Sequence, residues 1–433
     1  MSSASSSQAT VPPVIAPLSL GKNLAVTFPA NLLYSACQWG ILVVLTKVGS
    51  KELVGLFVLA LALTSPVFVC ASLKLREIQA TDLTGQFRFG DYLGLRLLST
   101  VLALAVAFGV AWSVGHRQSV LVAVLLVAGA KGIESISDVV YGLLQQHERM
   151  DRVAHSRVAH GLATLTGVGV GALATGDVVG AAAGLLVARL LVLVACDVPL
   201  ARWIVGPGGT TRLRPFFTWH PLRRLLLLGL PLAGTTLLTS LEINIPHYFV
   251  ATSLGVAELG VFGAVVTLIT AGGIFTRAVN MVTSPRLAAL YQDRDFAGFR
   301  RLLFRILGGY LVLGVIGVAV VPFLGRWLLT FLYRAEYAEH TDLLLLVMCA
   351  AAVAYQAGAL TTSLIAIRVI HRQLPLRLTT ATTSLVACVV LVPIFGMGGA
   401  ALALVAAKLP FVMVSLVIVL RATRSRVTDV GVA

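Results

Sequence analysis

The stretch AKGIESISDVVYG, residues 130–142, places three ionisable side chains inside an otherwise apolar segment. Lys131, Glu134 and Asp138 are spaced so that a helix presents all of them on one face. A charge at the centre of a bilayer costs roughly 2.5–3.5 kcal/mol, so such side chains normally face a partner or water. The stripe predicts either an internal Lys131–Glu134 ion pair at a helix contact or the wall of a hydrated cavity, and we favour the cavity wall.

Polar side chains at helical spacing also occur in the apolar segments at 23–46, 225–250, 259–282 and 342–366. Several such stripes together predict a central hydrophilic cavity that binds a substrate. The predicted substrate-binding residues are Lys131, Glu134, Arg277, His247, Asn244, Asn31, Gln38 and Gln356. The residues predicted to form coupling or structural ion pairs are Asp138, Glu242, Arg189 and Lys408. For Asp138, Asp197 and Arg277 an alternative is a place near a helix end, from which they reach the lipid headgroups.

The sequence lacks the motifs of the common enzyme classes. It contains no HExxH, no GxSxG and no P-loop, so we expect a protein that is not an enzyme. Its five cysteines are scattered in apolar runs without CxxC spacing, which indicates packing residues. His147, His155 and His160 are expected in a solvated loop. We therefore predict neither a metal site nor a cofactor, and the coupling ion stays open.

The composition is that of a polytopic membrane protein. Of 433 residues, 58% are hydrophobic and 12% charged, and the mean hydropathy is +0.93. The net charge of +15 lies mostly in short loops, which excludes a soluble nucleic-acid-binding surface. The sequence predicts an all-α fold of about twelve transmembrane helices, at residues 23–46, 53–74, 92–114, 119–144, 158–176, 178–200, 225–250, 259–282, 302–330, 342–366, 378–396 and 398–421.

Lys and Arg concentrate in the loops that follow every second helix, which predicts that these loops and both termini are cytoplasmic. The Ser- and Pro-rich N-terminus lacks the basic start of a secretory signal. The expected organisation is a disordered cytoplasmic tail at 1–22, an N-terminal lobe at 23–210, a C-terminal lobe at 211–421 and a cytoplasmic tail at 422–433.

The two halves of the chain resemble each other. KELVGLF (51–57) and AELGVF (257–262) align at an offset of 205 residues, which pairs Gly55 with Gly260. GAAAGLLVARL (180–190) and GAALALVAAKL (399–409) align without gaps at an offset of 219, which pairs Arg189 with Lys408. The sequence therefore predicts two parallel six-helix repeats around the cavity.

Six segments carry a resemblance to a known family. They are FRFGDYLGLRLLS (87–99), SDVVYGLLQQHERMD (137–151), LGLPLAGTTLLTSLEINIPHYFV (228–250), AELGVF (257–262), SPRLAALYQDRDFAGFRRLL (284–303) and LLTFLYRAEYAEHTDLL (328–344). In this order they resemble the polysaccharide flippases, of O-antigen and capsule type, in the multidrug/oligosaccharidyl-lipid/polysaccharide exporter superfamily. Similarity extends over about residues 20–420.

The resemblance implies two lobes in a V around a cavity that opens alternately to each side. It also implies an undecaprenyl-pyrophosphate-linked oligosaccharide as substrate, membrane lipids and polysaccharide polymerase machinery as partners, and a place in the bacterial cytoplasmic membrane. Related sequences often have Arg where this chain has His247, so a permanent positive charge there is in doubt. A multidrug or organic-cation antiporter of the same superfamily and a membrane glycan polymerase or ligase stay as alternatives.

Overall fold

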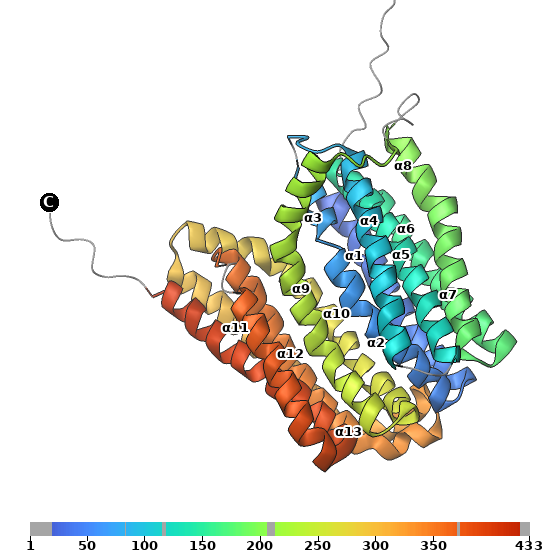
Figure 1. Cartoon of the computed structure of the whole chain (residues 1–433). Helices are drawn as coiled ribbons and strands as arrows, with labels where there is room; N and C mark the ends of the chain where they lie inside the picture. Colours follow the sequence, from blue (N-terminus) through green and yellow to red (C-terminus); the bar gives the residue numbers. More distant parts are fainter. Residues whose placement is uncertain (1–19, 83, 115–117, 206–212, 370–372, 425–433) are drawn as a thin grey trace, which may run out of the picture.

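The computed structural model describes residues 20–82, 84–114, 118–205, 213–369 and 373–424, and within these ranges the regular structure is helical (Figure 1). The helices of the first half are α1 (Leu20–Val48), α2 (Lys51–Ala71), α3 (Leu75–Thr81), α4 (Phe89–Val114), α5 (Gln118–Gln146), α6 (Met150–Thr175), α7 (Val178–Val192), the π-helical turn η1 (Leu193–Asp197) and α8 (Val198–Val205). Those of the second half are α9 (Trp219–Ser253), α10 (Val256–Gln292), α11 (Phe296–Leu332), the 3₁₀ helix η3 (Ala335–His340), α12 (Thr341–Ala366) and α13 (Gln373–Ala422).

Eleven helical segments in the described part of the chain are long and apolar enough to span a membrane. The last of them, α13, has 50 residues and consists of two helices that meet at Gly396. Gly396 has φ 56° and ψ −131°, a conformation that favours glycine because it has no Cβ. The predicted all-α polytopic fold is confirmed, and the predicted pair 378–396 and 398–421 corresponds to the two arms of α13.

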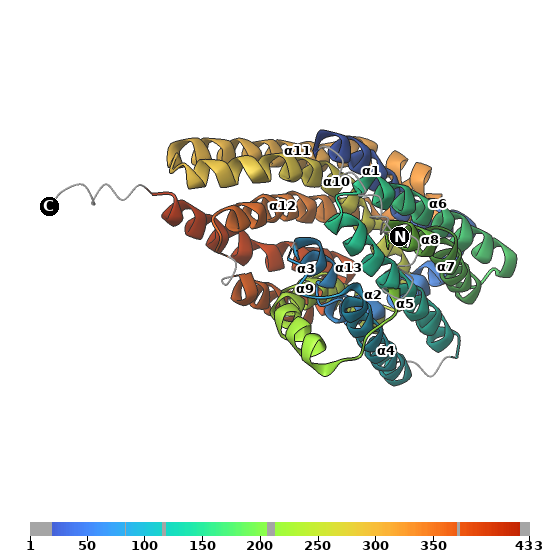
Figure 2. The ribbon, with the colours of Figure 1, turned by 90° about the horizontal axis from the view of Figure 1, so that it is seen from above.

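Two groups of helices make up the molecule (Figures 1 and 2). In the N-terminal lobe, α6 packs on α1 and α7, while α5 packs on α4 and α7. In the C-terminal lobe, α12 packs on α11 and on α13, and α13 also packs on α9. Helix α10 contacts both α12 and α2, and thus joins the lobes. Residues 1–19 and 425–433, which make up most of the predicted tails at 1–22 and 422–433, lie outside the described residues, as does the connection at 206–212.

The lobes touch through a reciprocal contact between α2 and α10. A Cβ added to Gly55 would collide with the carbonyl oxygen of Val256, and a Cβ added to Gly260 would collide with that of Lys51. The two contacts are equivalent in the repeats, because Gly260 and Val256 lie 205 residues after Gly55 and Lys51. Glycine lets helix backbones approach closely in a membrane. The aligned glycines therefore lie where the two repeats meet about a pseudo-twofold axis.

Contacts between distant connections mark two faces of the described structure. On one face, Lys51 at the start of α2 forms an ion pair with Glu336 of η3 at 3.4 Å, and Arg334 donates to the main chain of Lys47 at 2.8 Å. On the other, Asn23 near the start of α1 donates to the main-chain oxygen of Glu148, between α5 and α6. The first face therefore carries the α1–α2 connection and η3, and the second carries the start of α1 and the α5–α6 connection.

Candidate functional site

Helix α5 carries the charged stripe of the sequence, and the structure gives each member a partner on another helix. Lys131 Nζ donates to Ser65 Oγ of α2 at 3.1 Å. Glu134 forms an ion pair with Arg189 of α7. Asp138 accepts from Arg96 of α4 at 3.0 Å. The expected Lys131–Glu134 pair is absent among the described residues, so that interpretation of the stripe is wrong.

Burial explains why Glu134 pairs with Arg189. An i, i+3 pair on an isolated helix in water contributes only about 0.2–0.5 kcal/mol. The Arg189 side chain is 9% exposed, and a buried cation without an acid is costly. Arg189 also donates to the main-chain oxygen of Ala130 on α5, one turn before Glu134. Because α7 packs against α5, Glu134 pairs with Arg189 of α7 and not with Lys131 of its own helix.

Small residues bring α7 against α6 and so position Arg189. The GAAAG segment of α7 places Gly180 and Gly184 against Gly171 and Gly167 of α6. A Cβ on any of these four glycines would collide with main-chain atoms of the partner helix or, at Gly180, with the side chain of Thr175. Close approach of this kind is the role of small residues spaced four apart in membrane helices. It directs the charged end of α7 into the centre of the N-terminal lobe.

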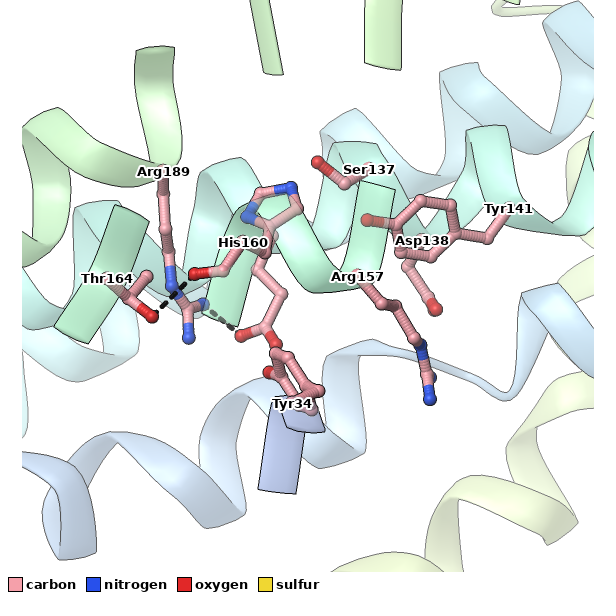
Figure 3. Close-up of a pocket in the computed structure, with 9 residues that line it drawn as sticks. Tyr34, Ser137, Asp138, Tyr141, Arg157, His160, Thr164 and Arg189 are labelled. Atoms are coloured by element: carbon pink, nitrogen blue, oxygen red, sulfur yellow. Dashed lines mark hydrogen bonds and ion pairs between the residues drawn. The ribbon is translucent and has the colours of Figure 1, made fainter. Parts of the chain in front are cut away.

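A polar cavity of about 60 Å³ lies between α1, α5, α6 and α7 (Figure 3). Its lining residues are Tyr34, Glu134, Ser137, Asp138, Tyr141, Arg157, His160, Thr164 and Arg189. A volume of this kind holds a few waters, because one water needs only about 10–15 Å³ of it. The cavity therefore suits water or a small ion.

Two residues that line this cavity, Tyr141 and His160, belong to a buried hydrogen-bonded chain. His160 Nε2 lies 3.0 Å from an oxygen of Asp197, and Ser156 Oγ donates to the other oxygen. The hydroxyls of Ser156 and Tyr141 are 2.7 Å apart. Asp197 is fully buried at the end of η1, and π-helical turns are frequent at functional sites. The expectation of a solvated His160 and the headgroup alternative for Asp197 are both wrong.

Sequence reasoning missed these residues because each was judged in its own segment. His160 lies on α6 and Asp197 on η1, 37 residues apart in the chain. The signal that could have found them is the short α6–α7 turn at Asp177, which makes the two helices antiparallel neighbours. Counting outwards from this turn brings the two positions to similar depth.

The other end of the stripe forms a second polar group at the junction of α3, α4 and α5. Asp138 interacts with two arginines, Arg96 at 3.0 Å and Arg76 at 3.4 Å. The Arg96 side chain is 1% exposed, whereas the side chains of Arg76 and Asp138 are 16% and 32% exposed. Arg76 also lies over the ring of Tyr141, with 5.4 Å between guanidinium and ring centre. Two cations on one acid give this partly exposed group a net positive charge.

The predicted site residues on α1 belong to the same lobe. Asn31 accepts a hydrogen bond from Arg157 at 2.6 Å, and Gln38 donates to Thr164 at 3.3 Å. Arg157 also lies over the ring of Tyr34, at 5.8 Å. The structure therefore brings Asn31, Gln38, Glu134 and Asp138 together with Arg189 in one region of the N-terminal lobe.

The predicted residues of the C-terminal lobe lie apart from this region. Glu242 of α9 is 2% exposed, forms an ion pair with Lys408 and has Arg377 at 3.9 Å, both on α13. Asn244 donates to the main chain of Ser240 on its own helix at 2.7 Å. The repeat-related cations Arg189 and Lys408 thus each bind an acid, but the acids come from different predicted helices, and only Glu242 is buried.

Three further predicted residues of this lobe have separate surroundings. His247 is 8% exposed, bonds through Nδ1 with the main-chain oxygen of Ile243 at 3.1 Å, and packs edge-on against Phe262. Gln356 donates to the main-chain oxygen of Leu307 on α11 at 3.1 Å. Arg277 on α10 is exposed and forms no ion pair with a described residue.

None of the described residues forms a cluster of three or more His, Cys, Asp or Glu side chains suited to a metal ion. The protonatable groups of the N-terminal lobe are instead joined to arginines and hydroxyls. The arrangement can hold charge, move a proton over a short path and bind an anion at its arginines.

Comparison with known structures identifies the class of protein. An inward-facing multidrug resistance MATE family transporter of the MOP superfamily superposes with a TM-score of 0.71 at 15% identity, covering 90% of this chain and 94% of that chain. An outward-facing structure of such a transporter gives 0.63 at 15% identity, covering 93% and 95%. A MOP superfamily transporter from Pyrococcus furiosus gives 0.61 at 15% identity, covering 93% and 97%. The chain has the fold of this transporter superfamily.

Sequence comparison then gives the family. Residues 20–291 match the family described as polysaccharide biosynthesis protein, and the chain belongs to that family. It is 26% identical over 328 residues to the capsular polysaccharide biosynthesis protein CapF of Staphylococcus aureus, covering 75% of this chain and 80% of the relative. The resemblance to polysaccharide flippases of the MOP superfamily is confirmed, and the chain is a multi-pass membrane transporter of polysaccharide biosynthesis and export.

Proposed function

We propose that this protein moves an undecaprenyl-pyrophosphate-linked oligosaccharide from the cytoplasmic to the outer leaflet of a bacterial cytoplasmic membrane by alternating access. The proposal includes a cytoplasmic position for both termini and for the face with the α5–α6 connection. The observation that carries the proposal is the net positive group formed by Arg76, Arg96 and Asp138 in a transporter of the polysaccharide family. A diphosphate needs such a group because it must leave water to cross the membrane.

The electrostatics of this group favour exchange of one anion for another. Asp138 holds Arg76 at 3.4 Å, a longer contact than its bond to Arg96, and both Arg76 and Asp138 are partly exposed. A diphosphate offers several oxygens to an arginine fork, so it competes with a single carboxylate. Arg96 is buried and stays with Asp138, which keeps the acid neutralised when Arg76 turns to the substrate.

Lys131 and Arg277 are proposed to complete the binding of the diphosphate from the two lobes. Lys131 lies on α5, where its ammonium has only a neutral hydroxyl as bonded partner. Arg277 lies on α10, exposed and without an ion pair to a described residue. Cations from opposite lobes can close on one anion, and Coulomb attraction is screened less in the membrane than in water. Glu134, bound to Arg189, is not needed to restrain Lys131.

The test is transport by the purified full-length protein in vesicles of phosphatidylethanolamine and phosphatidylglycerol. The probe is undecaprenyl-pyrophosphate-linked hexosamine with a fluorophore on the sugar, and an impermeant quencher reports how much probe each leaflet holds. We expect the protein to equilibrate this probe and to leave a fluorescent phosphatidylcholine in its leaflet. Uptake of an organic cation driven by a pH gradient, without movement of the lipid probe, would refute the proposal and favour the antiporter.

Variants of Lys131 and Arg277 test the binding of the diphosphate. Lys131→Ala and Arg277→Ala are each expected to slow transport at least about tenfold, the effect of losing roughly 1.4 kcal/mol of transition-state attraction. Lys131→Arg should retain part of the activity because it keeps the charge but alters donor geometry. Arg305→Ala, at an exposed position on α11 that has no role in the proposed site, is the matched control for loss of a positive charge. Normal transport by both Lys131→Ala and Arg277→Ala would remove these residues from the site.

A further inference from the structure

The C-terminal lobe contains an apolar groove that the polar sites do not use. A hollow of about 820 Å³ runs between the two arms of α13 near its ends. Pro375, Leu376 and Thr379 line it from the first arm. Val414, Val417 and Arg421 line it from the second arm. Almost all of this surface is hydrocarbon, so its occupant in a membrane is a lipid chain.

A second hollow continues the groove along the first arm of α13. Its volume is about 380 Å³, and Thr382, Val386 and Val390 line it at spacings of four residues, which marks a single helix face. Thr379 in the first hollow lies one turn before Thr382 in the second. The two hollows therefore follow one another on the same face.

The length of this groove distinguishes between lipids. From Pro375 to Leu391 the helix rises about 24 Å, at 1.5 Å per residue. The hydrocarbon core of a bilayer is about 30 Å thick, so the acyl chain of one phospholipid covers only about 15 Å of it. A single chain that fills the whole groove must therefore be longer than a phospholipid acyl chain. A long isoprenoid chain fills it by itself, whereas phospholipids would need one chain from each leaflet.

Arg421 adds charge at one end of the groove. It lies in the last turn of α13, is exposed, and forms no ion pair with a described residue. A single cation at the mouth of an apolar groove is complementary to an amphiphile with an anionic head group and one long tail. The face that carries this end of α13 is the proposed cytoplasmic face, where the lipid-linked substrate begins its path.

We propose that this groove, defined by Pro375 to Leu391 and by Val414 to Arg421, holds the isoprenoid tail of the lipid-linked substrate while its head group crosses between the lobes. The inference rests on the proposed function. Lipid is as apolar as the groove, so van der Waals packing against the two arms of α13, and not the hydrophobic effect, retains the tail. The groove thereby keeps the tail beside the C-terminal lobe and within reach of the head group throughout the cycle.

Filling the groove tests the proposal. Val414→Trp places an indole in the first hollow, where the valine is 44% exposed. Transport of the C55 probe in the vesicles described above should fall roughly tenfold because the tail is displaced. A probe with a ten-carbon isoprenoid tail, too short to need the groove, should move at the wild-type rate. Val312→Trp on α11, where the valine is 58% exposed to lipid, is the matched control and should transport both probes normally.

The outcomes separate this inference from the function on which it rests. If the wild type moves neither probe, the proposed function fails and the groove proposal falls with it. If the wild type moves both and Val414→Trp slows both equally or neither, only the groove proposal is overturned. A photoreactive benzophenone residue at Val417 should cross-link to undecaprenyl phosphate added to the vesicles. Cross-links to phosphatidylglycerol that excess undecaprenyl phosphate does not displace would assign the groove to ordinary lipid.

Discussion

Replacing Gly55 or Gly260 by alanine should shift the conformational equilibrium of the transporter. In the structure, the lobes are joined where α2 and α10 cross, and a Cβ at either position would overlap a main-chain carbonyl of the other helix. A main-chain atom cannot rotate away, so the helices must separate locally. Alanine should therefore favour the state in which the lobes have parted at this face.

The magnitude follows from the contact. Overpacking of this kind costs about 1–3 kcal/mol. Alanine also favours helix over glycine by up to about 1 kcal/mol, but α2 and α10 are helical in both states, so this gain cancels. The collision occurs only in the joined state and should shift the population ratio by roughly 5- to 150-fold. The double variant should shift the ratio by less than the product of the two single effects, because one separation of the helices relieves both collisions.

Thiol labelling measures this shift. Val58 is 6% exposed and lies against Gly263 across the same crossing, so a cysteine there reacts only when the lobes part. In a protein without the native cysteines, Val58→Cys should label faster with an impermeant reagent when Gly55 or Gly260 is alanine. Gly308 on α11 has no atom within 4 Å of an added Cβ, and its alanine variant is the control. Equal labelling rates in all four proteins would refute the reasoning.

Three further predictions concern charge and burial. Glu242→Gln leaves two cations without their acid and should lower the free energy of unfolding by about 3–5 kcal/mol. Lys408→Met should lower it less, because the acid keeps Arg377 beside it. Thermal unfolding in detergent gives the order, and equal unfolding midpoints would contradict it. His247→Arg should lower the unfolding midpoint more than His247→Ala, because the side chain is buried beside a main-chain oxygen and a phenyl ring; the reverse order would favour the anion-binding role that the sequence predicts. A cysteine at Arg300 should resist an impermeant thiol reagent in intact cells, while one at Glu339 should react; labelling at Arg300 would reverse the proposed orientation.

The helices were predictable from the sequence because the bilayer sets their length. The predicted segment 119–144 corresponds to α5 at Gln118–Gln146, within two residues at either end. The repeat was predictable because close packing requires glycine, and the aligned Gly55 and Gly260 meet at the lobe contact. In both cases the requirement, a span of the bilayer or a close helix contact, restricts which residue types can occur at a position and is therefore visible in the sequence.

The partners of the charged residues were less predictable. Spacing places Lys131 and Glu134 on one face, but it does not show which neighbouring helix offers a buried cation. Arg189 binds Glu134 across 55 residues of chain, and its choice depends on the rotation of α7 against α5. His160 and Asp197 were missed for the same reason, since the π-helical turn that ends at Asp197 changes the direction of its side chain and leaves no clear trace in hydrophobic periodicity.

The acids that pair with Arg189 and Lys408 also differ in how long each waits for its partner during synthesis. Arg189 emerges 55 residues after Glu134, which at 5–20 residues per second is roughly 3 to 11 s. Glu242 precedes Arg377 by 135 residues, from 377 minus 242, or roughly 7 to 27 s, and Lys408 comes later still. Through that interval α9 carries an acid with neither of its cations yet made. Its stable insertion should therefore depend on protonation of Glu242, or on retention beside the translocation machinery until the arms of α13 arrive.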